Sequence, residues 1–288
     1  MKILTWNVQW FKGLDEVVDI KRVIEHARGM ADFDAICMQE VAVNYRGLTG
    51  ETEPDQIKAL RALLPEFEVV FSPAVDELSP CGEFRRQFGN VIASRVPIRQ
   101  IQHFALPNPP ATSSEPTPSM PRIALDCTLQ APWGPVRLMT THLEYYNEAA
   151  RHAQARALRD LHLQSCALAA QQPKPQPGSP YELKPHTMDA LLCGDFNFEY
   201  DSPEHASIIE PGASGSWVNS WEFLHSGKPY PATFRIFDRT YGPEPVGCDF
   251  FFVSPSLGER VQDLVVDQQT QASDHQPVVI HCETEARH

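Results

Sequence analysis

Short apolar runs rich in β-branched or aromatic residues recur along the whole chain, and turn residues bound most of them, so they predict β-strands. These runs cover residues 2–8, 34–41, 67–71, 89–95, 99–105, 122–130, 135–142, 189–194, 248–253, 261–267 and 277–282. Apolar residues at helical spacing predict helices over residues 14–30, 55–64 and 147–171. Hairpin-like pairs of strands, at residues 89–105 and 122–142, interrupt the alternation of strands and helices. The pattern therefore favours two β-sheets packed face to face, with helices on their outer sides, over a plain doubly wound sheet.

Polar clusters stand at the ends of several of these runs. They are Trp6-Asn7, Gln39-Glu40, Thr141-His142-Leu143-Glu144, Gly194-Asp195-Phe196-Asn197, Gly247-Cys248-Asp249 and Ser273-Asp274-His275. Because a strand fixes the direction of its side chains, polar residues at several strand ends can meet at one edge of a sheet. Two histidines, several acids and two asparagines in one cleft would indicate metal-assisted hydrolysis rather than packing.

Asn7 and Glu40 each end an apolar run, and Glu40 is a candidate for holding a cation. An asparagine in such a run costs roughly 1–3 kcal/mol unless its amide is hydrogen-bonded. A carboxylate placed like that of Glu40 should either emerge at the sheet edge or hold a cation. One or two protein carboxylates are enough to bind Mg²⁺, because the ion keeps several of its water ligands. Taken alone, Asn7 is also explained as a turn-former and Glu40 as a surface acid. The evidence that either residue is functional comes from the other clusters.

Asp195 and Asn197 follow an apolar run through Gly194. If the strand continues, alternation puts both side chains on the same side and turns Phe196 away. An ionised aspartate can accept a proton from water, and an asparagine amide can orient that water or a phosphate oxygen. The alternative is a turn-forming Gly-Asp-X-Asn sequence without a catalytic role.

His275 and Asp249 form the proposed imidazole–carboxylate pair. A histidine that faces a buried carboxylate keeps one tautomer and is more easily protonated. The imidazolium would stabilise the charge that develops on phosphoryl oxygens. His142, at the end of another predicted strand, offers a second imidazole for the phosphate or the leaving group. The alternative for His275 is a core histidine whose hydrogen bonds are satisfied.

The net charge and the pattern of cysteines limit the binding partners and the cellular compartment that we expect for this protein. The formal net charge is −13 and the pI is about 5.3, which disfavours binding of long duplexes by a broad basic face. The seven cysteines are scattered without a CxxC pair, and four of them (Cys37, Cys127, Cys193 and Cys248) lie in strand-like runs, which predicts reduced core thiols of a cytoplasmic protein. No leader-like segment precedes the first strand, and no apolar run approaches the ~20 residues of a membrane span.

Proline and glycine concentrate in segments 106–121, 172–187 and 225–247. Such segments can be linkers between domains. Here the polar clusters fall on both sides of all three, and a single cleft would need both sides. We therefore expect loops within one domain, residues 1–288, and we expect these loops to line the cleft and influence the substrate.

In their order along the chain, the clusters resemble the motifs of the endonuclease/exonuclease/phosphatase superfamily. The resemblance runs from Thr5-Trp6-Asn7 to Ser273-Asp274-His275-Gln276-Pro277, with Gln39-Glu40-Val41, Phe88-Gly89-Asn90-Val91, Thr141-His142-Leu143-Glu144, Gly194-Asp195-Phe196-Asn197 and Asp249-Phe250-Phe251-Phe252-Val253 between them. It implies a four-layer α/β sandwich like that of deoxyribonuclease I, with two packed mixed β-sheets, flanking helices and an active site at one sheet edge. Trp6-Asn7 and Thr141-His142-Leu143-Glu144 look most similar to the tyrosyl-DNA phosphodiesterase branch.

The resemblance also implies roles for individual residues. Those like Asn7, Glu40 and Asp274 hold a divalent cation, Mg²⁺ or Mn²⁺, or align its ligands. Those like Asp195 and Asn197 position and activate the attacking water. The one like His275, supported by the one like Asp249, contacts the phosphate, and the one like His142 lies on its other side. Asn90, in the matching Phe88-Gly89-Asn90-Val91 segment, is an expected substrate-binding residue. Apart from the resemblance, the positions of Arg85, Arg86 and Arg95 near this segment predict a short strand-binding rim.

Gln9 departs from the pattern, because exonuclease III-like repair enzymes usually carry an acid there; this weakens a second metal subsite and disfavours an abasic-site endonuclease. We expect metal-dependent, nuclease-like hydrolysis of phosphodiester bonds, with short or single-stranded nucleic acid among the candidate substrates. The alternative is a phosphatase or phosphodiesterase acting on a small-molecule, nucleotide or lipid-headgroup ester, which the negative charge favours. A binding module without chemistry is disfavoured because no proposed catalytic position is missing. The sequence indicates no obligate protein partner.

Overall fold

Alternate side chains of the first strand, β1 (Lys2–Asn7), enter different hydrophobic cores. Ile3 lies in the core between two sheets, whereas Leu4 lies in a core under helices. Leu191 and Leu192 divide in the same way between the inter-sheet core and a third core beneath another helix. Strands buried on both faces therefore build four layers, with helices outside two packed sheets. The structure is a computed structural model that describes residues 1–50, 54–110, 116–171 and 174–284.

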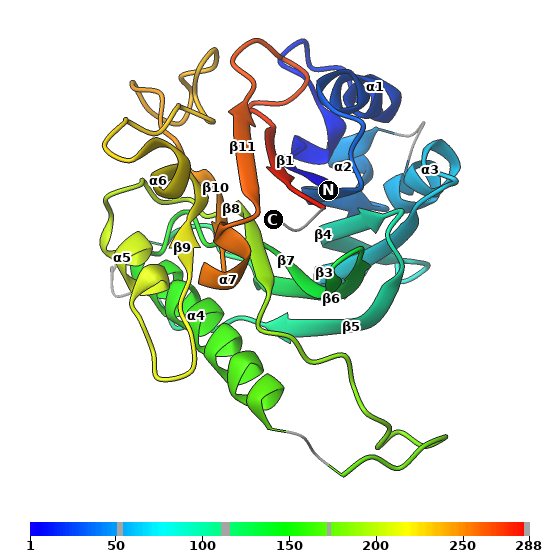
Figure 1. The fold of residues 1–288 in the computed structure, drawn as a ribbon. Helices are drawn as coiled ribbons and strands as arrows, with labels where there is room; N and C mark the ends of the chain where they lie inside the picture. The colour runs from blue at the N-terminus through cyan, green and yellow to red at the C-terminus, as the bar shows by residue number, and fades with distance from the viewer. Residues whose placement is uncertain (51–53, 111–115, 172–173, 285–288) are drawn as a thin grey trace.

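Both sheets are mixed and have six strands each (Figure 1). The first has the order β11 (Val261–Val266), β12 (Val278–Cys282), β1, β2 (Ala35–Val43), β4 (Arg85–Ser94) and β3 (Glu68–Leu78). The second has the order β5 (Ile98–Ala105), β6 (Ile123–Ala131), β7 (Gly134–His142), β8 (Ala190–Asp195), β10 (Asp249–Val253) and β9 (Val218–Asn219). The pairs β1–β2 and β7–β8 are parallel, and the other pairs are antiparallel.

Helices cover the outer faces of both sheets. Helices α1 (Ile20–Met30) and α3 (Gln56–Leu63) pack on the first sheet, and α4 (Glu148–Ala170) packs on the second, on the opposite side of the molecule (Figure 1). The shorter helices are η1 (Gln9–Phe11), α2 (Arg46–Thr49), α5 (Pro203–Ile209), α6 (Ser220–His225) and α7 (Pro255–Gly258). This confirms the predicted fold class, a four-layer α/β sandwich.

The predicted strands are present, but several local predictions were wrong. The helix predicted over 14–30 begins only at Ile20, because the Asp19 carboxylate accepts a hydrogen bond from the backbone N–H of Arg22 at 2.9 Å and caps it. Strand β4 begins at Arg85 rather than at the predicted residue 89, so residues 85–88 also belong to it. Elements as short as β9, α5 and α6 were missed because a few residues carry no readable periodicity.

The three proline-rich segments all belong to connections that lead into strands of the second sheet, and segment 225–247 lies between α6 and β10. Segment 106–121 lies between the paired strands β5 and β6, and segment 172–187 lies before β8, which pairs with β7. Residues 111–115 and 172–173 of these predicted loops lie outside the described residues. Over the ranges described, none of the helices combines the length and apolar character that a membrane crossing requires.

His205 makes the stability of the fold depend on pH. Asn219 accepts a hydrogen bond from the Trp221 N–H with Oδ1, so its Nδ2 donates to His205 Nε2 at 2.9 Å, which requires a neutral imidazole. Burial lowers the pKa of His205 to about 4. Because this folded-state pKa is depressed, the stabilisation is present above the unfolded value of about 6.5 and is lost as pH falls toward 4.

We expect His205 alone to lower the free energy of unfolding by about 2 kcal/mol between about pH 7.5 and pH 5. Urea unfolding of wild type and His205→Gln at both pH values measures this, since the glutamine amide oxygen can accept the same hydrogen bond without titrating. Equal pH dependence in the two proteins would contradict the prediction.

Candidate active site

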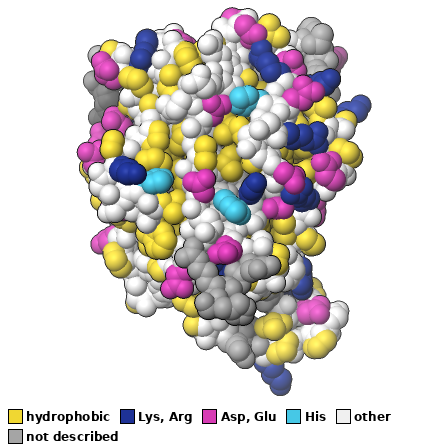
Figure 2. Space-filling view, turned by 45° about the horizontal axis from the view of Figure 1, so that its top comes forward, with side chains coloured by type: hydrophobic (Ala, Val, Ile, Leu, Met, Phe, Trp, Pro, Cys, Tyr) yellow, Lys and Arg dark blue, Asp and Glu magenta, His cyan; other side chains and the backbone are white. Residues whose placement is uncertain are grey.

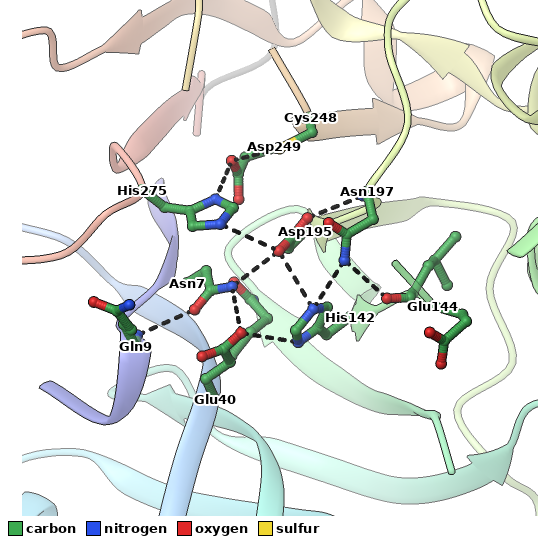
Figure 3. Close-up of polar contacts among 12 residues, drawn as sticks. Asn7, Gln9, Glu40, His142, Glu144, Asp195, Asn197, Cys248, Asp249 and His275 are labelled. Carbon is green, nitrogen blue, oxygen red and sulfur yellow. Dashed lines mark hydrogen bonds and ion pairs between the residues drawn. The ribbon is translucent and has the colours of Figure 1, made fainter. Parts of the chain in front are cut away.

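A cavity of about 300 Å³ lies where the ends of strands from both sheets meet. Cross-strand register puts three polar residues in a row, because Asp195 is the partner of His142 on β7 and of Asp249 on β10 (Figure 3). Asn7, at the end of β1 in the other sheet, faces this row. The glycine at position 194 lets β8 lie close to β7 beside Asp195, because a Cβ at this position would lie 2.0 Å from the carbonyl oxygen of Thr141 on β7.

Asp195 is at the centre of the site, and its buried carboxylate is surrounded by polar groups. Its Oδ2 accepts a hydrogen bond from Asn7 Nδ2 at 2.9 Å, and its Oδ1 accepts one from the Asn197 backbone N–H at 3.0 Å. The same Oδ2 lies 3.4 Å from His142 Nε2 and 3.6 Å from His275 Nε2. One carboxylate thus touches both imidazoles and both asparagines.

Asn197 orients His142 through its side-chain amide. The backbone of Asn197 has a φ of 52°, in the left-handed region that asparagine tolerates, and its Nδ2 donates to His142 Nε2 and to the Leu143 carbonyl, both at 3.0 Å. Burial lowers the pKa of His142 to about 3, and the nearby Arg122 charge adds to the effect. His142 is therefore a neutral imidazole that accepts at Nε2 and presents Nδ1 toward Glu40, 3.8 Å away.

His275 has the opposite charge state. Burial by itself would lower its pKa, but the negative charges of Asp249 and Asp195 raise the pKa well above the usual value. Its Nδ1 lies 2.9 Å from Asp249 Oδ2, which also accepts a hydrogen bond from the Thr233 hydroxyl at 2.6 Å. Phe234 stacks on the imidazole with centroids 4.3 Å apart. The site therefore holds an imidazolium whose Nε2–H points toward Asp195.

Acidic groups gather on the other side of Asn7. Glu40 occupies an irregularity of β2 with a φ of 61°, and its Oε1 accepts a hydrogen bond from Asn7 Nδ2 at 3.1 Å. Burial and the charges of Asp274 and Asp195 raise the pKa of Glu40 to about 7, and burial raises the pKa of Asp274. Gln9 Nε2 donates to Asp274 Oδ2 at 3.0 Å. These hard oxygen donors, with carboxylates that repel one another, fit a divalent cation.

The predicted substrate-binding residues do not gather at the cavity. Asn90 is buried and its Nδ2 donates to the Ile123 carbonyl at 3.1 Å, between the two sheets. Arg85 pairs with Asp76 and Arg86 with Glu77, while Arg95, at the other end of β4, pairs with Asp32 and Asp34. None of the four residues lines the cavity.

Other residues at the cavity were missed by the sequence reasoning. Arg122 is 7% exposed and lies 3.4 Å through Nε from Glu144 Oε2, while its Nη1 has no hydrogen-bond partner among the described residues. Its only signal in the sequence is a single cation at the start of an apolar run. Aromatic rings form much of the remaining wall, namely Trp10, Phe88, Tyr145, Tyr146, Phe234 and Tyr241. Nothing in the sequence patterns distinguished these rings from core aromatics.

Comparisons with known proteins agree with this arrangement. The sequence profile described as "Endonuclease/Exonuclease/phosphatase family" matches residues 4–275. None of the curated protein sequences matches the chain significantly. Among solved structures, an endonuclease/exonuclease/phosphatase from Beutenbergia cavernae superposes with a TM-score of 0.67 at 21% identity, over 98% of this chain and 72% of that one.

Two further solved structures share the fold. Truncated TDP2 from Caenorhabditis elegans has a TM-score of 0.65 at 18% identity, over 98% of this chain and 97% of that one. A mannosyl-6-phosphatase from Bacteroides thetaiotaomicron has a TM-score of 0.63 at 18% identity, over 98% of both chains. The profile match over nearly the whole length shows that the chain belongs to the endonuclease/exonuclease/phosphatase family and is a hydrolase of phosphate esters.

Proposed function

We propose that the protein hydrolyses its phosphate ester by direct attack of a water molecule, with a divalent cation bound beside the reacting phosphate. The observation that supports this most is the position of the Asp195 carboxylate, which contacts Asn7, Asn197, His142 and His275 at once. Such a carboxylate can accept a proton from water and is supported by groups that bind a phosphate. No covalent intermediate is required, because phosphoryl transfer needs positioning and electrostatic stabilisation.

Each polar group in this mechanism has a distinct task. Asp195 accepts the proton of the attacking water. Asn197 keeps its Nδ2 on His142 and on the Leu143 carbonyl, and it orients that water by accepting a hydrogen bond through Oδ1. His275, held by Asp249, donates a hydrogen bond and positive charge to the phosphoryl oxygens as negative charge develops. His142, being neutral, acts through hydrogen bonding rather than charge.

Glu40, Asp274 and Asn7 would hold the cation, which we propose to be Mg²⁺ or Mn²⁺. Gln9 adds a further oxygen: its Oε1 is buried beside them with no hydrogen-bond partner among the described residues. When bound, the cation supplies Lewis-acid polarisation of the phosphoryl group. It would also offset the burial of the carboxylate and the repulsion among the acids, which together raise the pKa of Glu40.

Glu40→Gln should weaken the apparent affinity for Mg²⁺ by at least about 10-fold, because it removes a ligand charge. Activity measured against Mg²⁺ concentration, after chelator treatment of the protein, gives this affinity. The matched control is Glu77→Gln, which removes an acid that pairs with Arg86 and lies away from the cavity. An unchanged Mg²⁺ dependence in Glu40→Gln would place the cation elsewhere.

The site favours a small phosphate ester over a long nucleic-acid strand. The sequence favoured a nuclease-like phosphodiesterase, but the arginines expected to bind a strand pair with acids instead. On the face shown in Figure 2, Lys and Arg side chains are interspersed with Asp and Glu rather than forming a basic surface. A cavity of about 300 Å³ with aromatic walls suits a compact ester. The similarity to a sugar-phosphate phosphatase supports this choice, and the similarity to TDP2 keeps short diesters as the second candidate.

A substrate panel with Mg²⁺ and Mn²⁺ tests the proposal. It should include sugar phosphates, nucleotides, inositol phosphates, sphingomyelin, RNA, and single-stranded and duplex DNA. We expect chelator-sensitive turnover of a small ester with a shallow salt dependence, because a single phosphate releases few counterions. A steep fall of affinity with salt would favour the strand substrate, and the absence of hydrolysis across the panel would contradict the proposed mechanism.

A further inference from the structure

Two tyrosines, Tyr145 and Tyr241, both line the cavity and join its walls to one another. The Tyr145 hydroxyl donates a hydrogen bond to the Tyr241 carbonyl at 3.2 Å, and the two rings meet edge to face with centroids 6.2 Å apart. Tyr145 lies three residues after His142. The Tyr241 ring lies against Phe234, which in turn stacks on His275. Because the two imidazoles lie on either side of the central carboxylate (Figure 3), the Tyr145–Tyr241 bridge runs from one side of the cavity to the other.

The Tyr145 end of this bridge is fixed by helix α4. Arg151, in the first turn of that helix, donates a hydrogen bond to the Tyr145 carbonyl at 2.8 Å. The Arg151 Nε also pairs at 3.0 Å with Glu204, which is 3% exposed. The Tyr146 ring meets the Tyr145 ring edge to face, with centroids 4.9 Å apart. The position of Tyr145 is therefore set by residues packed on the second sheet.

The Tyr241 end is held from within its own loop. Arg235 Nη1 donates a hydrogen bond at 2.9 Å to the same Tyr241 carbonyl that accepts from Tyr145. The next residue, Gly242, has a φ of 148°, and a Cβ there would overlap the Arg235 guanidinium. The carbonyl thus accepts two hydrogen bonds, which hold the bridge in place before any substrate binds.

A wall at this place distinguishes between two kinds of phosphate ester. The attacking water and the leaving group lie roughly in line on opposite sides of the phosphorus. The leaving group is the only organic substituent of a monoester, whereas a diester has a second one that must extend sideways. The cation ligands, the two imidazoles and the Tyr145–Tyr241 bridge surround the phosphate in these sideways directions. A cavity of about 300 Å³ bounded in this way has room for one substituent.

We propose that the Tyr145–Tyr241 bridge makes the enzyme selective for phosphomonoesters, because it closes the side of the cavity through which the second substituent of a diester would pass. This inference rests on the proposed function, in which water attacks the same phosphate. Attack forms one P–O bond and breaks the ester P–O bond, so the products are inorganic phosphate and an alcohol, which keeps the leaving oxygen and gains a proton.

Kinetics with two chromogenic esters tests the bridge. p-Nitrophenyl phosphate and bis(p-nitrophenyl) phosphate release the same chromophore, and their difference in intrinsic reactivity is the same for every variant. Wild type with Mg²⁺ should prefer the monoester. Tyr241→Ala should raise the diester-to-monoester ratio of kcat/KM by at least about tenfold, as expected when a steric barrier in a pocket is removed. Tyr145→Phe, which loses only the bridging hydroxyl, should raise the ratio by about threefold.

The matched control is Tyr181→Ala, which removes a tyrosine that is 75% exposed and does not line the cavity. It should leave the ratio unchanged. General damage to the fold lowers turnover of both esters and does not change the ratio, so the ratio separates selectivity from stability. Tyr145→Phe keeps the ring and decides the question if Tyr241→Ala melts early by circular dichroism. An unchanged ratio in the folded bridge variants overturns the proposal.

Binding distinguishes a failure of this inference from a failure of the proposed function. Calorimetry with Mg²⁺ compares phenylphosphonate, which has one organic substituent, with methylphenylphosphinate, which has two; neither contains an ester bond. Wild type should bind the phosphonate more tightly, and both bridge variants should reduce this difference. If no ester is hydrolysed but this pattern appears, the proposed function fails and the bridge stands. If esters are hydrolysed but the selectivity is the same in all variants, the bridge proposal is wrong and the function stands. No hydrolysis and no binding of either compound overturns both.

Discussion

Asp195→Asn should lower kcat by about 10³-fold or more, with little change in KM and in the free energy of unfolding. The substitution keeps the shape of the side chain but removes the group that accepts the proton of water, and general-base catalysis contributes about 10²–10⁴-fold. Because Asp195 also touches His142 and His275, its loss further weakens the positioning of the phosphate. Steady-state kinetics on the substrate from the panel, with saturating Mg²⁺, measures the effect.

The matched control for this prediction is Asp189→Asn. Asp189 directly precedes β8 at the end opposite to Asp195, and its Oδ1 accepts a hydrogen bond from Ser256. Both variants remove one negative charge next to the same strand, so an effect of net charge or strand stability would appear in both. Full activity in Asp189→Asn with retained activity in Asp195→Asn would exclude Asp195 as the base.

The ends of strands could be predicted from the sequence because an apolar run followed by a polar residue is a local pattern. Asn7, His142 and Asp195 were found in this way, and the structure brings them into contact. The contact itself depends on register, which pairs His142 with Asp195 across two parallel strands far apart in the chain. No local pattern gives such a register.

The pairing of side chains in the folded structure also explains which predictions about single residues failed. Arg86 was expected to face a nucleic acid, but the register of the β3–β4 hairpin pairs it with Glu77. Gln9 was interpreted only as a position that lacks the acid of exonuclease III-like enzymes. In the structure its side-chain amide donates a hydrogen bond to Asp274, a residue near the other end of the chain. Arg122 was not singled out, because a lone cation beside an apolar run gives no sign that it will be buried. In the structure its Nη1 has no hydrogen-bond partner among the residues described. Charges can be counted in a sequence, but their partners are set by the fold.

Asp249→Asn should lower kcat by about 10²–10³-fold, because it removes the charge that keeps His275 protonated and correctly oriented. His275→Gln should have an effect of similar size. The double variant should be no worse than the more impaired single variant, since the two residues act as one unit and such effects are not additive. Kinetics of the single and double variants in one double-mutant cycle measures this coupling. If the two losses in kcat simply multiply, Asp249 acts on the reaction independently of His275, and the proposed pair is wrong.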